Sequence, residues 1–131
     1  MDVKELKKHI TAVVRAYPEV KLVYLFGSAA REDTGPLSDV DVAVYLEGLG
    51  KREAGELRLK LASDLMKRLQ TDKVDVTVLN VLDAPELKYQ VITQGLLIYE
   101  EEPYRVLVEP RVLNEYFDFK LLLSRYGLTK A

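Results

Sequence analysis

Two short segments of this chain alternate aspartate with valine, and they constrain its fold more than any other feature. They are residues 39–46 (DVDVAVYL) and 74–79 (VDVTVL). Side chains two positions apart on a β-strand point to the same face of the sheet. Asp39 and Asp41 would therefore share one face, while the valines between them share the other, and Asp75 repeats this arrangement. The pattern predicts two strands, each with an apolar face packed on helices and an acidic face.

Hydrophobic periodicity extends this prediction to the rest of the chain. Apolar residues at helical spacing predict helices at 3–16, 52–70, 84–94 and 111–125, and short apolar runs predict further strands at 21–26 and 96–99. Pro103 and Pro110 bracket a segment that reads as a turn or a short helix. Strands interleaved with helices favour an α/β or α+β fold, with a small mixed sheet flanked by helices. We expect one domain over residues 1–131, since no linker or repeat divides it.

Composition excludes several classes of function. The chain has no cysteine, which rules out disulfides, thiolate metal ligands and cysteine nucleophiles. Its formal net charge of −2 argues against a large nucleic-acid interface, which normally needs a basic face. The polar N-terminus lacks a signal-peptide core, and no apolar run approaches the ~18 residues of a membrane span. We therefore expect a soluble cytoplasmic protein that binds no membrane.

The paired aspartates are candidate metal ligands. With a rise of ~3.3 Å per residue, the Cα atoms of Asp39 and Asp41 would lie ~7 Å apart, where two negative charges repel each other. A divalent cation turns this repulsion into attraction, and oxygen-only ligands favour Mg²⁺ or Mn²⁺ over Zn²⁺. A neighbouring strand would bring Asp75 beside the pair. The alternative is an exposed strand face that carries scattered acids and no metal.

A Gly-Ser pair follows the predicted strand 21–26. Gly27 lets the backbone approach a ligand closely, and Ser28 can cap a short helix, so this turn offers free N–H groups and a hydroxyl to a phosphate. Arg31, one helical turn further on, can reach the same phosphates. Residues 32–38 (EDTGPLS) read as a loop. The alternative is a capped turn with no ligand.

Taken together, these motifs resemble those of the nucleotidyltransferases of the DNA polymerase β superfamily. The shared pattern is Gly-Ser, ten residues, Asp-x-Asp and a third carboxylate on a later strand, and the string GSAAREDTGPLSDVDVAVYL (27–46) is similar to the minimal, single-domain branch. The segments 74–80, 87–99 and 111–120 further resemble MNT-type antitoxins, which are paired with HEPN-domain toxins. Two departures are Glu32, where the family often has glycine, and Pro110, which interrupts what is usually a longer helix.

The resemblance implies a specific reaction. Asp39, Asp41 and Asp75 would hold two Mg²⁺ ions, with Mn²⁺ as a substitute, while Gly27, Ser28 and Arg31 would hold the phosphates of ATP. AMP would pass from ATP to a tyrosine hydroxyl of a HEPN toxin by in-line displacement of pyrophosphate, which would neutralise the toxin. Two alternatives stay open. One is nucleotidyl transfer to a small molecule or RNA, and the other is an antitoxin that acts by binding alone.

The predicted last helix, 111–125, carries more apolar surface than a core-facing stripe needs. Its apolar residues cover a wide arc of the helix; they are Val112, Leu113, Tyr116, Phe117, Phe119, Leu121, Leu122 and Leu123. A domain of this size can bury only part of that surface, so we expect some of it to contact a partner protein. The alternative is that all of it closes over the domain core.

Overall fold

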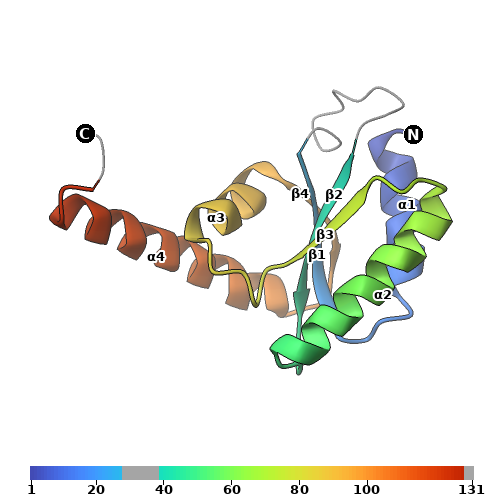
Figure 1. Ribbon diagram of the computed structural model, residues 1–131, viewed down its shortest axis with the longest axis horizontal. Coiled ribbons are helices and arrows are strands. Elements are labelled where there is room, and N and C mark those ends of the chain that lie inside the picture. The colour runs from blue at the N-terminus through green and yellow to red at the C-terminus, as the bar shows by residue number, and fades with distance from the viewer. Residues whose placement is uncertain (28–38, 129–131) are drawn as a thin grey trace.

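In the part of the chain that the structure describes, a four-stranded sheet carries a pair of helices on each face (Figure 1). The computed structural model describes residues 1–27 and 39–128. Along these ranges the elements are α1 (Val3–Val14), β1 (Val20–Phe26), β2 (Val40–Leu46), α2 (Lys51–Leu69), β3 (Val74–Val78), α3 (Pro85–Gln94), β4 (Leu96–Glu100) and α4 (Tyr104–Arg125). No helix within these ranges is long and apolar enough to cross a membrane.

The sheet is mixed, as the sequence predicts. Its strand order is β3-β2-β1-β4; β1 runs antiparallel to both β2 and β4, and β2 runs parallel to β3. A parallel pair needs a crossover connection, and α2 provides it between β2 and β3. The structure therefore confirms the predicted α+β class and the nucleotidyltransferase-like arrangement of a small sheet between helices.

One face of the sheet, which we call the inner face, is covered by α1 and α2. The valines of the two Asp/Val strands point to this side and are buried, as their alternation predicts. They meet the leucines that recur every four residues along α2, namely Leu57, Leu61, Leu65 and Leu69. The result is the larger of the two apolar clusters.

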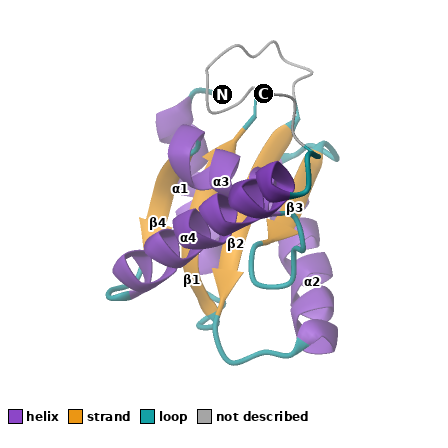
Figure 2. Cartoon of the chain, turned by 90° about the vertical axis from the view of Figure 1, so that its left-hand side faces the viewer, coloured by secondary structure: helices purple, strands orange, loops and turns teal. Residues whose placement is uncertain are grey.

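The opposite face, which we call the outer face, is covered by α3 and α4 (Figure 2). Its apolar cluster is smaller and joins Tyr24 and Ala43 of the sheet to Val91, Val108 and Val112 of the two helices. Because strand side chains alternate, Asp41 and Asp75 belong to this outer face. The acidic side chains therefore lie on the same side of the sheet as α3 and α4.

The last helix is longer than the sequence predicts. We expected it to begin at 111, but α4 starts at Tyr104 and continues through Pro110. Proline removes one backbone hydrogen bond and crowds the preceding turn, which ordinarily kinks or breaks a helix. Here Val108 and Val112 are buried on either side of Pro110, so packing on the sheet holds both flanking turns in place.

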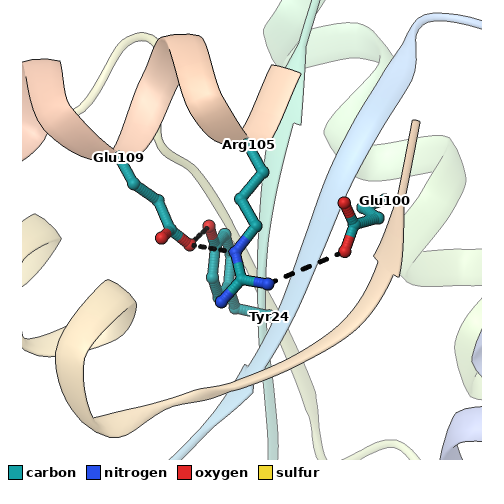
Figure 3. Close-up of polar contacts among 4 residues, drawn as sticks. All are labelled: Tyr24, Glu100, Arg105 and Glu109. Atoms are coloured by element: carbon teal, nitrogen blue, oxygen red, sulfur yellow. Dashed lines mark hydrogen bonds and ion pairs between the residues drawn. The ribbon is translucent and has the colours of Figure 1, made fainter. Parts of the chain in front are cut away.

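A polar network fixes the first half of α4 to the central strand (Figure 3). The hydroxyl of Tyr24, on β1, donates a 2.6 Å hydrogen bond to Oε2 of Glu109. Arg105 Nε donates to the same oxygen at 3.3 Å, and its Nη1 lies 3.9 Å from Oε2 of Glu100 at the end of β4. Burial and the hydrogen bond to Glu109 both raise the pKa of Tyr24, so the hydroxyl remains a donor. These contacts explain why the helix starts before Pro110.

Candidate active site

Strand register brings the candidate residues to one edge of the sheet. The antiparallel pairing of β1 with β2 places Phe26 opposite Asp41, so Gly27 follows directly beside that aspartate. The parallel pairing of β2 with β3 places Asp75 opposite Asp41. Asp39 immediately precedes β2. The predicted placement of the third aspartate beside the Asp-x-Asp pair is therefore confirmed, although the roles of these residues stay predictions.

Gly27 cannot be replaced by a larger residue without movement. Its φ is +74°, a conformation that L side chains rarely adopt. A Cβ atom built on Gly27 would lie 2.5 Å from Oδ2 of Asp41. The backbone at the end of β1 therefore passes directly under the Asp41 carboxylate. A site that combines a backbone turn with the acidic groups requires such a close approach.

The electrostatics of the site disfavour a bare, fully ionised set of carboxylates. Burial raises the pKa of Asp41, and the negative charges of Asp75 and Asp39 raise it further. Asp39 and Asp75 also line a shallow depression of about 280 Å³ beside Asp72 and Lys73. A positive charge placed among these groups would stabilise all of them.

Arg58 of α2 is a nearby residue that the sequence analysis missed. Its Nε donates a 2.7 Å hydrogen bond to the backbone carbonyl of Val76, and its Nη2 lies 4.0 Å from Oδ1 of Asp75. The guanidinium is thus held at the edge of β3, where it partly balances the charge of Asp75. In sequence, Arg58 is only a basic residue beside the leucine stripe of α2, so no pattern distinguished it.

The donor chemistry fits a hard divalent cation. Asp39, Asp41 and Asp75 present only carboxylate oxygens, the ligands that Mg²⁺ prefers. Among residues 1–27 and 39–128, however, no group of three or more His, Cys, Asp or Glu side chains is gathered closely enough to hold a metal ion. The assignment of metal ligands therefore stays a prediction based on strand register and charge.

Part of the predicted phosphate site lies outside the described residues. Ser28, Arg31 and Glu32 fall in that segment, as does the predicted loop 32–38. On the α3 side of Gly27 there is a cavity of about 200 Å³ that the sequence analysis also missed. Its lining comes from the end of β1 and from α3, namely Phe26, Gly27, Leu87, Gln90, Gln94 and Gly95. Only the packing of α3 against β1 creates it, so no local motif pointed to it.

Comparison with known proteins relates this edge of the sheet to a family of enzymes. Residues 8–104 match the sequence family described as polymerase beta, nucleotidyltransferase. This range contains Gly27, Asp39, Asp41 and Asp75. A search of curated protein sequences gives no significant match.

Several solved structures share the fold over almost the whole chain. A chain in a crystal structure of a toxin–antitoxin with AMP-PNP is 26% identical, with a TM-score of 0.77, covering 92% of this chain and 94% of that chain. A chain of the toxin–antitoxin MntA–HepT is 25% identical, with a TM-score of 0.71 and 94% of each chain covered. At 24% identity and a TM-score of 0.71, a chain in the complex of a tri-AMPylated Shewanella oneidensis HEPN toxin with MNT antitoxin shows the same fold, covering 94% of this chain and 93% of that chain.

The family match spans most of the chain, and the strand register within it places Asp75 opposite the second residue of the Asp-x-Asp pair and Gly27 beside it. The chain belongs to the polymerase beta nucleotidyltransferase family.

Proposed function

We propose that this chain is a Mg²⁺-dependent adenylyltransferase that transfers AMP from ATP to a tyrosine hydroxyl of a HEPN toxin and thereby neutralises the toxin. The observation that carries the proposal is the register of Asp41 opposite Asp75, with Gly27 beside them, in a chain of the nucleotidyltransferase family. Support for the substrate and partner comes from related chains at 25–26% identity, which belong to toxin–antitoxin structures, one of them with AMP-PNP.

The carboxylates would provide the reaction centre. Asp39, Asp41 and Asp75 would hold two divalent ions. When bound, such ions stabilise the attacking and leaving oxygens of an in-line displacement. The tyrosine oxygen forms a bond to the α-phosphorus of ATP while the bond between the α-phosphorus and the bridging oxygen breaks, and pyrophosphate leaves. The phenolic proton would pass to Asp75, which Arg58 holds at the edge of β3 through a 4.0 Å ion pair.

The turn after β1 would hold the leaving pyrophosphate. The lack of a Cβ at Gly27 lets the Asp41 carboxylate lie against this turn, so phosphates bound by the backbone of the turn would lie beside the carboxylates. Ser28 would contribute a hydroxyl and a backbone N–H, and Arg31 a guanidinium, to the β- and γ-phosphates. This assignment of Ser28 and Arg31 rests on the sequence pattern alone.

We further propose that residues 1–131 act as one domain, in which α4 serves the contact with the partner.

No described feature favours a small-molecule or RNA acceptor, and the net charge of −2 argues against a nucleic-acid partner. Neutralisation by binding alone differs from AMP transfer in one measurable respect: it needs neither ATP nor the carboxylates. A single labelling experiment separates these possibilities.

The test incubates the purified chain with labelled ATP, Mg²⁺ and the product of the neighbouring gene, which the proposal expects to be a HEPN protein. We expect the label on the HEPN protein, a mass shift of AMP on a tyrosine in its tryptic peptides, and loss of toxin activity only when ATP and Mg²⁺ are present. EDTA should abolish the label. Neutralisation without ATP and without a mass shift would overturn the proposal in favour of binding alone. Label on RNA or on a small molecule would overturn the choice of acceptor.

A further inference from the structure

The helix α4 has two opposite apolar faces, and the domain buries only one. Toward the sheet, Val108 and Val112 are buried in the outer-face cluster. Further along, the ring of Tyr116 stacks on Tyr89 of α3, with 3.8 Å between ring centroids and 13° between the planes. These contacts fix the orientation of the helix on the body of the protein. The face that points away from the body is therefore defined as well.

A second row of apolar residues runs along the face that points away from the body. Its members recur at intervals of three or four residues, which keeps them on one side of a helix; they are Val106, Pro110, Leu113, Phe117 and Leu121. We call this row the outer stripe. Val106 is 74%, Phe117 57% and Leu121 59% exposed. Intervals of three and four residues are those of a surface that packs against another helix.

The centre of the outer stripe is held in a fixed position. The ring of Phe117 contacts Tyr116 and Tyr89 edge to face, at centroid distances of 5.4 Å and 6.1 Å. Two aromatic neighbours restrict the rotamers of Phe117 before any partner arrives, which lowers the entropy lost on binding. Exposed aromatic residues that are already rigid are the usual anchors of protein interfaces.

The second half of α4 extends beyond α3 (Figure 1). No other described element covers this end of the helix. Two residues that do not belong to the outer stripe are therefore exposed there as well: Leu122 is 50% and Tyr126 68% exposed. Scattered exposed apolar residues are normal on a protein surface, whereas a continuous row beside a projecting helix end marks an interaction site. The apolar surface of this end is therefore available from more than one side.

The two kinds of comparison differ in how much of α4 they include. The nucleotidyltransferase family match ends at residue 104, where α4 begins. The matches to chains of toxin–antitoxin structures cover 92–94% of this chain, which leaves less than a tenth of it unmatched. Since α4 has 22 residues, those matches must include at least about half of the helix. The helix is thus common to this chain and to chains from toxin–antitoxin structures, yet lies outside the catalytic family domain.

We propose that the outer stripe of α4 is the docking surface for a helix of the HEPN partner, with Phe117 as its central anchor. This inference rests on the proposed function for the identity of the partner. Docking on the outer stripe would hold the partner over α4, on the same side of the sheet as Asp41 and Asp75. Affinity and chemistry would then depend on separate sets of residues.

The test compares a double variant, Phe117→Glu with Leu121→Glu, with the control Leu59→Glu. Leu59 is 65% exposed on α2, whose buried face packs on the inner face of the sheet, so the control adds a charge at an equally exposed leucine. Affinity for the purified HEPN protein is measured by calorimetry. The double variant should bind at least about a hundredfold more weakly than the wild type. The control should bind within about twofold, and both variants should keep the wild-type affinity of the free chain for ATP.

Photo-crosslinking gives an independent measurement that does not depend on charge in the stripe. A photoreactive amino acid at position 121 should crosslink to the HEPN protein, whereas one at position 59 should not. A folded double variant that binds as tightly as the wild type would overturn the proposal. So would a double variant that only dissociates pairs of this chain, since the stripe would then bind a second copy. Tight binding of the wild type without AMP transfer would overturn the proposed function and leave the docking surface intact.

Discussion

The two faces of the sheet are built from the same strands and yet differ in what they contain. On the inner face, valines of β2 and β3 meet leucines of α2 in an aliphatic cluster. On the outer face, apolar side chains alternate with polar ones, including the Tyr24–Glu109 hydrogen bond, the Lys88–Glu115 ion pair and Asp41. Period-two alternation makes this division possible, because each strand can serve both faces at once.

The difference separates stability from chemistry. Burial of aliphatic side chains contributes free energy roughly in proportion to area and tolerates no charge, so the inner face suits a core. The outer face keeps half-exposed carboxylates close together, which a core could not do at acceptable cost. Substitutions on the inner face should therefore lower stability and spare activity per folded molecule. Substitutions at the acidic edge should lower activity and spare stability.

The largest expected effect is on activity at the acidic edge. Asp41→Asn removes a charge without changing volume and should lower AMP transfer at least about a thousandfold, since the proposed metal site would supply several kcal/mol of transition-state stabilisation. Circular dichroism should show an intact fold. The matched control is Asp83→Asn, at an aspartate after β3, which should keep the wild-type rate. Full activity of Asp41→Asn at saturating Mg²⁺ would remove Asp41 from the site.

The largest expected effect on stability lies on the inner face. Leu61→Ala removes a fully buried side chain from the cluster between α2 and the sheet, and should lower the free energy of unfolding by roughly 2–5 kcal/mol. Leu59→Ala, at an exposed position of the same helix, should change it by less than about 0.5 kcal/mol. Urea denaturation measures both. Transfer activity per folded molecule should be unchanged in Leu61→Ala, and a loss of activity would show that the two faces are not independent.

Gly27→Ala should affect both stability and activity. The positive φ and the 2.5 Å approach of a Cβ to Asp41 Oδ2 should destabilise the fold by roughly 1–3 kcal/mol and displace the carboxylate. The matched control is Gly48→Ala, because Gly48 has a φ of +83° but a Cβ at that position would meet no heavy atom within 4 Å. Both variants should lose stability from backbone strain, and only Gly27→Ala should also lose transfer activity. Equal activity in the two would contradict the close approach.

Sequence patterns predicted the inner face better than the outer face, for a physical reason. The valines of β2 and the leucines of α2 recur at the period of their own element, so local spacing alone identifies the buried side. That Asp41 and Asp75 lie on the opposite face could be anticipated for the same reason, since both aspartates alternate with valines. Nothing local specified strand order, which depends on how the helices pack.

The outer face depends on contacts between distant parts of the chain, which spacing does not reveal. Pro110 looked like a helix boundary, but the Tyr24–Glu109 bond joins residues 85 positions apart and helps to carry the helix through it. Arg58 gained its role only because β3 lies beside α2. The wide apolar arc of 111–125 predicted some exposed surface, yet only the stacking of Tyr116 on Tyr89 decides which side is exposed.

A smaller effect is expected at the polar network that holds α4. Tyr24→Phe removes the hydroxyl that donates a hydrogen bond to Glu109. Because Arg105 still contacts the Glu109 carboxylate, the free energy of unfolding should fall by only about 1 kcal/mol. The comparison is Tyr17→Phe, which removes a hydroxyl that donates to Asp64 at a more exposed position, where the loss should be smaller. If the two variants lose the same free energy of unfolding, burial on the outer face does not strengthen the Tyr24–Glu109 hydrogen bond.

The smallest expected effect is a pH-dependent gain of stability in Asp41→Asn without metal. Burial and the charges of Asp75 and Asp39 raise the pKa of Asp41 in the folded state, so the folded protein holds its proton more tightly than the unfolded chain. Below the unfolded pKa of about 3.9 the carboxyl is protonated in both states and costs nothing. As the pH rises through the raised folded pKa, the wild type loses stability, whereas an asparagine has no proton to lose.

In EDTA, the melting temperature of Asp41→Asn should therefore equal that of the wild type near the unfolded pKa and exceed it modestly at neutral pH. The gain should be only a fraction of a kcal/mol, because solvent screens a partly exposed carboxylate. Thermal melts across this pH range, with Asp83→Asn as control, measure the difference. Mg²⁺ at neutral pH should stabilise the wild type more than the variant and so reverse the order. A gain that is independent of pH would mean that charge repulsion at this edge does not cause it.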